Sequence, residues 1–211
     1  MDISDIRREY SKHGLTREEA GEAPFDLFAV WFAQARESEG EECNAMGLAT
    51  ADAQGRPSLR VVLLKGCDER GFVFFTNYQS RKGREIEENP QVALTFHWST
   101  LERQVRIEGV AQKVSQAESD AYFNSRPRLS RLAAAVSPQS RQVEGRHTLE
   151  KQLEELAQRY QDQEIPRPPH WGGYLVRPHR IEFWQGRPGR LHDRIVFERR
   201  QRGWTSRRLA P

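Results

Sequence analysis

The sequence predicts an α+β protein built on an antiparallel sheet or barrel, with helices inserted between its strands. Short apolar segments are separated by hairpin-like turns such as Asp52-Ala-Gln-Gly55 and Asp68-Glu-Arg-Gly71. No regular alternation of strands and helices is present, and no GxGxxG or GxxxxGK[ST] loop occurs. This argues against a Rossmann or P-loop nucleotide site and favours antiparallel pairing.

The elements follow from apolar patterning and from turn residues. Strands are expected at Ala45–Ala51, Ser58–Lys65, Phe72–Thr76, Gln91–Trp98, Gln104–Val114, Gly173–Arg177, Ile181–Trp184 and Leu191–Arg199, with a further candidate at Trp204–Leu209. Helices are expected after Pro24, at Ser80–Asn89, from the capping box Ser115-Gln-Ala-Glu118 to about Arg126, and at Thr148–Gln161.

Composition suits one large domain with a heavily charged surface. The chain has 211 residues, of which 36% are hydrophobic and 30% charged, and its net charge is only +3. This balance argues against a nucleic-acid partner. The two cysteines and six histidines show no disulfide or metal-ligand spacing, so no metal is expected. Without an apolar leader or a membrane-length run, a soluble, cytoplasmic protein is expected, with a flexible segment at residues 1–22.

The stretch from Ile181 to Arg194 contains the most informative group of candidate functional residues. An apolar run ends at Trp184, and after a turn Arg190, His192 and Arg194 occupy alternate positions. If that piece is a strand, the three side chains share one face, because side chains alternate with period two. Two guanidiniums and an imidazole on one face suit an anionic ligand beside a group that can move a proton.

Other segments combine phosphate-binding groups. Ser80, Arg81 and Lys82 begin a helix, where backbone N–H groups favour anions, although an ordinary capped helix explains them equally well. Tyr122, Arg126 and Ser130, at spacings of four, could hold a second phosphate.

Two strands also carry cations, and for both the plain structural interpretation is favoured. Arg60-Val-Val-Leu-Leu-Lys65 is a buried-looking strand whose terminal cations can reach water, and Gln104-Val-Arg106 reads as a half-exposed strand. The chain as a whole offers many anion-binding groups and few general bases. This pattern is typical of a protein that binds phosphorylated molecules and leaves the chemistry to a cofactor.

Taken together and in order, these motifs resemble the pyridoxine/pyridoxamine 5′-phosphate oxidase family. The motifs are Arg7-Arg-Glu-Tyr10, Arg60–Lys65, Phe75-Thr-Asn77, Ser80-Arg-Lys82, Leu101-Glu-Arg-Gln-Val105, Tyr122-Phe with Ser125-Arg-Pro127, Gln139-Ser140, Trp171-Gly-Gly173, Ile181–Gln185, Arg190–Arg194 and Arg208–Pro211. The resemblance implies an FMN-binding split β-barrel over residues 23–211 with peripheral helices. It also implies a homodimer with FMN at the subunit interface, and oxidation of pyridoxine or pyridoxamine 5′-phosphate to pyridoxal 5′-phosphate by O₂, giving H₂O₂.

The resemblance also assigns residues. FMN would be held by Arg60, Val61, Val62, Leu63, Leu64, Lys65, Phe75, Thr76, Arg81, Lys82, Gln104, Gln139, Ser140, Trp184 and Arg194. The substrate would contact Arg7, Arg8, Glu9, Tyr10, Lys65, Tyr122, Arg126, Ser130, Arg190, Leu191 and His192, with Arg190 and His192 as the catalytic pair.

The chain departs from the family pattern at two places. Ala133-Ala-Ala135 replaces the usual Gly-Ala-Trp, and His97 stands where Pro or an aromatic residue is expected; both are interpreted as structural variation. Two alternatives remain. One is a related flavin oxidase of phenazine biosynthesis, and the other is a non-enzymatic flavin or pyridoxal phosphate binder on the same barrel. The Arg7–Tyr10 segment and the set of Tyr122, Arg126 and Ser130 argue against the first. The retention of Arg190 and His192 argues against the second.

Overall fold

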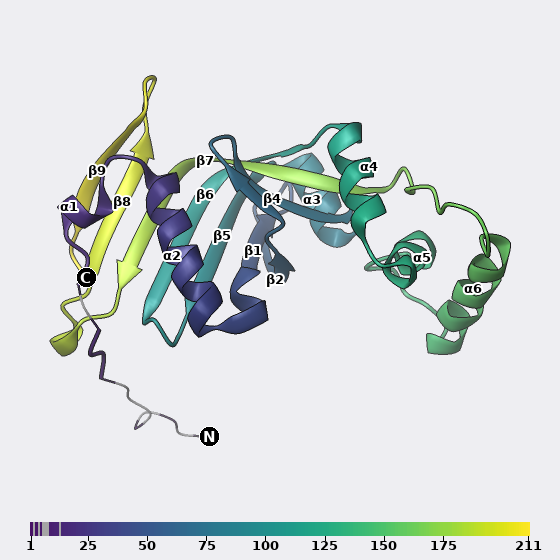
Figure 1. Cartoon of the computed structure of the whole chain (residues 1–211), viewed down its shortest axis with the longest axis horizontal. Coiled ribbons are helices and arrows are strands. Elements are labelled where there is room, and N and C mark those ends of the chain that lie inside the picture. Colours follow the sequence, from purple (N-terminus) through teal and green to yellow (C-terminus); the bar gives the residue numbers. More distant parts are fainter. Residues whose placement is uncertain (2, 4, 6–8, 13) are drawn as a thin grey trace.

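The computed structural model describes residues 1, 3, 5, 9–12 and 14–211, and over this part of the chain one curled antiparallel sheet dominates (Figure 1). Its strands are β1 (Ala45–Ala51), β2 (Pro57–Leu63), β3 (Gly66–Asp68), β4 (Gly71–Asn77), β5 (Gln91–Trp98), β6 (Arg103–Lys113), β7 (Trp171–Gln185), β8 (Asp193–Arg199) and β9 (Trp204–Leu209). The helices are α1 (Arg17–Ala20), α2 (Pro24–Ser38), α3 (Arg81–Glu88), α4 (Gln116–Ser125), α5 (Arg128–Val136) and α6 (Arg146–Arg159). Two 3₁₀ turns complete the described elements, η1 (Gly40–Asn44) and η2 (Pro188–Arg190). The predicted α+β class with an antiparallel sheet is confirmed.

Strand β7 organises the sheet. The main strand order is β2-β1-β5-β6-β7-β4-β3, and β8 pairs with β7 and β9. The first part of β7 pairs with β4, from Trp171 opposite Asn77 to Val176 opposite Phe72. Its last part pairs with β8, where Trp184 lies opposite Arg194. One strand therefore connects the two ends of the molecule (Figure 1).

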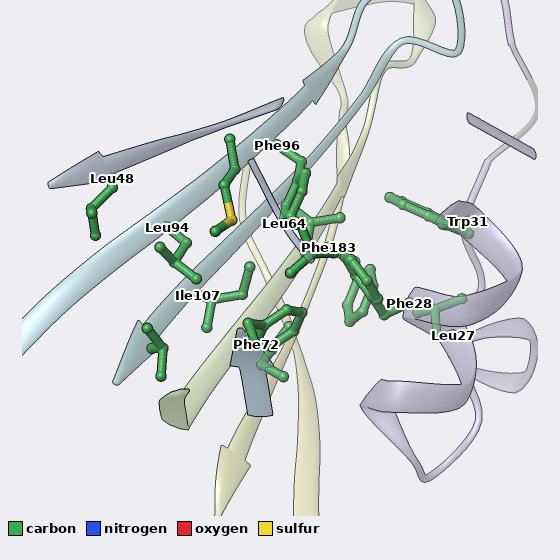
Figure 2. Packing of buried hydrophobic residues seen from close by; sticks show 14 of the residues in the cluster. Leu27, Phe28, Trp31, Leu48, Leu64, Phe72, Leu94, Phe96, Ile107 and Phe183 are labelled. Carbon is green, nitrogen blue, oxygen red and sulfur yellow. The ribbon is translucent and has the colours of Figure 1, made fainter. Parts of the chain in front are cut away.

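Helix α2 covers the sheet and closes the core. Pro24 occupies its first turn, as predicted, and Leu27, Phe28 and Trp31 face the strands (Figure 2). The Phe28 ring contacts Phe72 edge-on, with ring centroids 5.0 Å apart. A smaller apolar cluster of Phe123, Leu132, Ile165 and Trp171 packs helices α4 and α5 against the start of β7. Helix α2 thus covers one face of the sheet, and α4 and α5 pack beside the start of β7.

Two predicted strands, Gly173–Arg177 and Ile181–Trp184, prove to be parts of one strand, β7. Pro178 suggests a break because proline cannot donate a ladder hydrogen bond. In the structure Pro178 lies opposite Gly109 and Arg180 opposite Glu108, so the extra residue, His179, forms a bulge in β7. The bulge accommodates the missing donor, so the strand continues. Helix α5 and the short strand β3 were not predicted. Strand β3 has only three residues, and the helical spacing of Leu129, Leu132, Ala133 and Val136 in α5 was overlooked.

Strand β2 is not the buried strand that its apolar run suggests. Leu59 and Val61 are each 70% exposed and Leu63 is 44% exposed. The strand lies at the edge of the sheet with β1 as its neighbour, and within the described chain nothing covers these side chains. An apolar row of this kind on a sheet edge is typical of an interface.

The segment before α2 touches the sheet at its described residues. Leu15 is buried, its N–H donates to Asp193 and its carbonyl accepts from Arg208. The predicted flexibility of residues 1–22 stays a prediction. Among the described residues, no helix is both long and apolar enough to span a membrane.

Replacing Phe28 with alanine should destabilise the whole domain. Phe28 is 2% exposed, and its loss leaves a cavity between α2 and the sheet. We expect the free energy of unfolding in urea to fall by about 3–5 kcal/mol. The control Val30→Ala, on the same helix at a side chain that is 54% exposed, should change it by less than about 0.5 kcal/mol. Equal losses in the two variants would contradict this account of the core.

Candidate active site

A cavity of about 520 Å³ lies among β2, β4, α3, α4, α5 and the start of β7. We call it the main cavity. It brings together the predicted residues Val61, Val62, Leu63, Lys65, Phe75, Thr76, Lys82, Tyr122, Arg126, Ser130 and Gln139. Residues from both predicted phosphate sites therefore line one space, which their positions in the sequence did not show.

Lys82 is a buried cation surrounded by neutral oxygens. Ser80 caps α3, and from the first turn of that helix the Lys82 Nζ atom donates to Thr76 Oγ1 at 2.9 Å, Gln139 Oε1 at 3.1 Å and Ser80 Oγ at 3.2 Å. Within the described residues no carboxylate lies at ion-pair distance from it. Burial, with a smaller effect of the Arg60 charge, lowers the pKa of Lys82 to about 8. A phosphate would supply the missing negative charge.

Arg126 offers a second unsatisfied cation to the main cavity. Its guanidinium lies over the Trp171 ring, 4.6 Å from the centroid, and its Nη1 atom is buried without a hydrogen-bond partner among the described residues. Tyr122 stacks on Phe75 with ring centroids 3.9 Å apart. Burial lowers the pKa of Arg126. An unpaired buried donor is costly, so this atom is suited to an anionic ligand.

A second group of predicted residues lies at the other end of β7. Gln104 on β6, Trp184 on β7 and Arg194 on β8 are direct cross-strand neighbours. With His192 we call them the Trp184 cluster. Arg194 Nε donates to the buried Glu182 at 2.9 Å, which fixes the guanidinium beside Trp184.

His192 packs between aromatic rings. Its ring centroid lies 4.7 Å from that of Trp184 and 5.3 Å from that of Tyr10, which meets it edge-on. His192 Nδ1 accepts the Arg187 N–H at 3.1 Å. In the neutral ring the proton therefore resides on Nε2, which leaves Nε2 as a donor.

Arg190, His192 and Arg194 do not share one strand, and the predicted strand Leu191–Arg199 is wrong in its first two residues. Arg190 lies in the 3₁₀ turn η2 with φ 60°, and β8 begins only at Asp193. The glycine and proline before it impose a turn, so period-two alternation does not apply to Arg190 and His192. Arg190 and Leu191 are exposed.

Several predicted residues do not line the main cavity. Arg60 and Arg81 converge on Glu85 of α3 instead, and Leu64 is buried in the core with its N–H and carbonyl bonded to Asn44. Ser140 and Glu9 are exposed. The last two predicted residues, Arg7 and Arg8, lie outside the described residues.

Sequence reasoning missed several residues that line the main cavity. These are Asn77, Ala133, Ala134, Ser137 and Trp171. Trp171 and the Ala133-Ala-Ala135 segment had been noted only as motif positions. Their part in the cavity depends on α5, which was not predicted.

Family profiles match nearly the whole chain. The profile described as pyridoxamine 5′-phosphate oxidase matches residues 12–160. The profile described as the pyridoxine 5′-phosphate oxidase C-terminal dimerisation region matches residues 171–211.

Curated relatives named pyridoxine/pyridoxamine 5′-phosphate oxidase are similar over their full length. The relative from Rubrobacter xylanophilus is 56% identical, over 100% of this chain and 97% of its own. The relative from Bordetella pertussis is 54% identical, over 100% of both chains.

Solved structures support the same fold. The chain is similar to PhzG from Burkholderia lata 383, crystallised with tetrahydrophenazine-1-carboxylic acid, with a TM-score of 0.88 and 32% identity over 93% of this chain and 98% of that one. It is also similar to a pyridoxamine 5′-phosphate oxidase-related, FMN-binding protein from Nostoc punctiforme, with a TM-score of 0.72, 18% identity, and 90% and 98% of the two chains covered.

Fold and donor set together define a split-barrel flavoprotein, an oxidoreductase whose cofactor is FMN. Among the described residues Lys82 is buried without a counter-ion and Arg126 Nη1 has no hydrogen-bond partner, and both fit a site for phosphate-bearing molecules. The chain belongs to the pyridoxamine 5′-phosphate oxidase family. The predicted family, fold and cofactor are confirmed.

The burial of Lys82 should make the stability of the flavin-free protein depend on pH. Folded Lys82 loses its proton near pH 8, whereas the unfolded chain keeps it to about 10.5. Between these pH values the unfolded state binds more protons than the folded state, so the free energy of unfolding should rise with pH. Relative to the variant Lys82→Met, the rise should reach about 3 kcal/mol. Urea titrations at several pH values measure the difference. The exposed control Lys151→Met should show no such slope, and a flat difference for Lys82→Met would contradict the assignment.

Proposed function

We propose that the protein oxidises pyridoxine 5′-phosphate and pyridoxamine 5′-phosphate to pyridoxal 5′-phosphate and reduces O₂ to H₂O₂. The observation that carries this proposal is the buried, unpaired Arg126 Nη1 in a cavity that Lys65, Tyr122 and Ser130 also line. These donors suit a second phosphate besides that of FMN. The names of the full-length relatives point to the same substrates.

FMN would be held through both its phosphate and its ring. Lys82, whose ammonium group is held by the accepting oxygens of Thr76 and Gln139, offers a buried positive charge to the phosphate, and Arg60 and Arg81 add charge beside it. The proposed set is Arg60, Val61, Val62, Leu63, Leu64, Lys65, Phe75, Thr76, Arg81, Lys82, Gln104, Gln139, Ser140, Trp184 and Arg194. For Leu64 the side chain lies in the core, so its proposed role is to support the neighbouring strand.

We assign the chemistry to the Trp184 cluster and Arg190. When bound, FMN supplies the acceptor for the hydride that leaves the substrate C4′ carbon. His192, with its proton on Nε2, can donate a hydrogen bond to the C4′ substituent, and Arg190 can stabilise charge on the substrate. Tyr10, packed on His192 and Trp184, would help to exclude water.

One chain does not bring these groups together. Trp171 in the main cavity and Trp184 are separated by about 40 Å of extended β7, at about 3.3 Å per residue. The members of the Trp184 cluster do not line the main cavity. We therefore propose a homodimer in which the main cavity of one chain faces the Trp184 cluster of the other. The dimerisation region at residues 171–211 and the exposed Leu59, Val61 and Leu63 support it.

A related flavin oxidase with another substrate is the alternative. The likeness to PhzG, crystallised with tetrahydrophenazine-1-carboxylic acid, favours it. That ligand carries no phosphate, and it would leave the buried donor of Arg126 without a dianionic partner. The phosphorylated substrates are therefore preferred.

An H₂O₂ assay tests the proposed reaction. The purified protein should be yellow and should release H₂O₂ with pyridoxine and pyridoxamine 5′-phosphates. Unphosphorylated pyridoxine should react with a kcat/KM at least roughly 100-fold lower, because the buried donors would stay unpaired. Colourless protein that takes up no FMN would contradict the proposal. Preferential turnover of tetrahydrophenazine-1-carboxylic acid would favour the alternative.

Co-expression of two inactive variants tests the shared site. Arg126→Ala damages the main cavity and His192→Ala the Trp184 cluster, so a mixed dimer has one intact site and one with both defects. Random pairing should then restore about a quarter of wild-type turnover. The control pair Arg126→Ala with Tyr122→Phe, both in the main cavity, should restore none. No recovery in the first pair would show that each site is built within one chain.

A further inference from the structure

Glu85 is a buried acid at the junction of α3 with β1 and β2. Its side chain is on the inner face of α3, and the residue is 5% exposed. Its Oε2 atom accepts hydrogen bonds from Ser58 Oγ at 2.6 Å, from Thr50 Oγ1 and from Arg60 Nη2 at 3.3 Å. Its Oε1 atom accepts from Arg81 Nε at 2.8 Å. Both oxygens are therefore occupied by donors from three different elements.

These bonds keep Glu85 ionised. Burial alone would raise its pKa, but the hydrogen bonds from Ser58, Thr50 and Arg81 outweigh burial and lower the pKa to about 2. The carboxylate is thus charged at any pH at which the protein works. It is a fixed negative charge beside two guanidiniums.

Glu85 and its neighbours hold Arg60 in one orientation. Arg60 Nη1 donates to the Leu48 carbonyl at 3.1 Å and to Thr50, and Nη2 donates to Ser58 and Glu85. The Arg60 charge is close enough to lower the pKa of Lys82. An arginine on an edge strand such as β2 would otherwise sample many rotamers.

The charges around Glu85 balance a phosphate. Arg60, Arg81 and Lys82 contribute three positive charges and Glu85 one negative charge, which leaves +2. A phosphate monoester carries close to two negative charges at neutral pH. Glu85 pairs with both arginines, whereas Lys82 is left for a ligand.

We propose that Glu85 is a positioning residue for the FMN phosphate. It fixes Arg60 and Arg81 beside Lys82, and it neutralises part of the positive charge of the flavin-free site. This inference rests on the proposed function. If Glu85 instead only repelled the phosphate, removing its charge would strengthen FMN binding.

Titrations of full-length, flavin-free protein with FMN and with riboflavin, followed by flavin fluorescence, test the proposal. Glu85→Gln keeps the shape but removes the charge and one acceptor, so FMN binding should weaken roughly tenfold or more. Riboflavin, which lacks the phosphate, should bind as it does to the wild type. Glu85→Asp, which keeps the charge, should recover part of the FMN affinity. The control Glu88→Gln, on an exposed residue of the same helix, should bind both flavins normally.

The sign and the selectivity decide the result. Unchanged or tighter FMN binding by Glu85→Gln would overturn the proposal, and so would equal losses for FMN and riboflavin, which indicate a structural role. If Glu85→Gln does not fold, Ser58→Ala removes one donor to Glu85 and should still weaken FMN selectively; no selective loss there would also overturn the proposal. If the wild-type protein binds FMN no more tightly than riboflavin, this inference alone is overturned. One that binds neither flavin contradicts the proposed function as well.

Discussion

The continuous pairing of β7 is the constraint on which the rest of the structure depends. The strand pairs with β6 along most of its length, and it pairs with β4 at its start and with β8 at its end. Because β4 carries Phe75 and Thr76 while β8 carries Arg194, the strand holds the two parts of the proposed site at fixed and distant places. The bulge at His179, directly after Pro178, allows β7 to continue past the proline. A break there would uncouple the main cavity from the Trp184 cluster.

The two ends differ in how their charges are compensated. At the Trp184 cluster, Arg194 pairs with Glu182, and Arg187 and Arg208 pair with Asp193. In the main cavity, Lys82 is surrounded by neutral oxygens and Arg126 by aromatic rings. Of these two places, the main cavity is therefore the one whose described cations lack a carboxylate partner, and it is where the phosphates are expected. Beside the cavity, Glu85 neutralises part of the charge of Arg60 and Arg81, and burial lowers the pKa of Lys82 to about 8.

Much of this arrangement could be predicted from the sequence, and the remainder depends on tertiary contacts. The α+β class, the strand Gln91–Trp98 and the capped helix after Ser115 follow from local patterns. The phosphate-binding residue types were also visible as motifs. The convergence of Lys82 and Arg126 on one cavity was not, because α5 and the long β7 bring them together. The role of Glu85 could not be predicted either, because its hydrogen-bond partners come together only after β1, β2 and α3 have packed.

The exposed face of β2 joins assembly to cofactor binding under the proposed dimer. Val61 and Leu63 both line the main cavity and are exposed in the single chain. A partner that covers this edge strand would remove apolar surface from water and would close the cavity in the same step. Enclosure in turn strengthens each interaction between the phosphates and the cations, because the local dielectric constant falls. Dimer stability and cofactor affinity should therefore be coupled through β2, so that a change confined to Val61 acts on both at once.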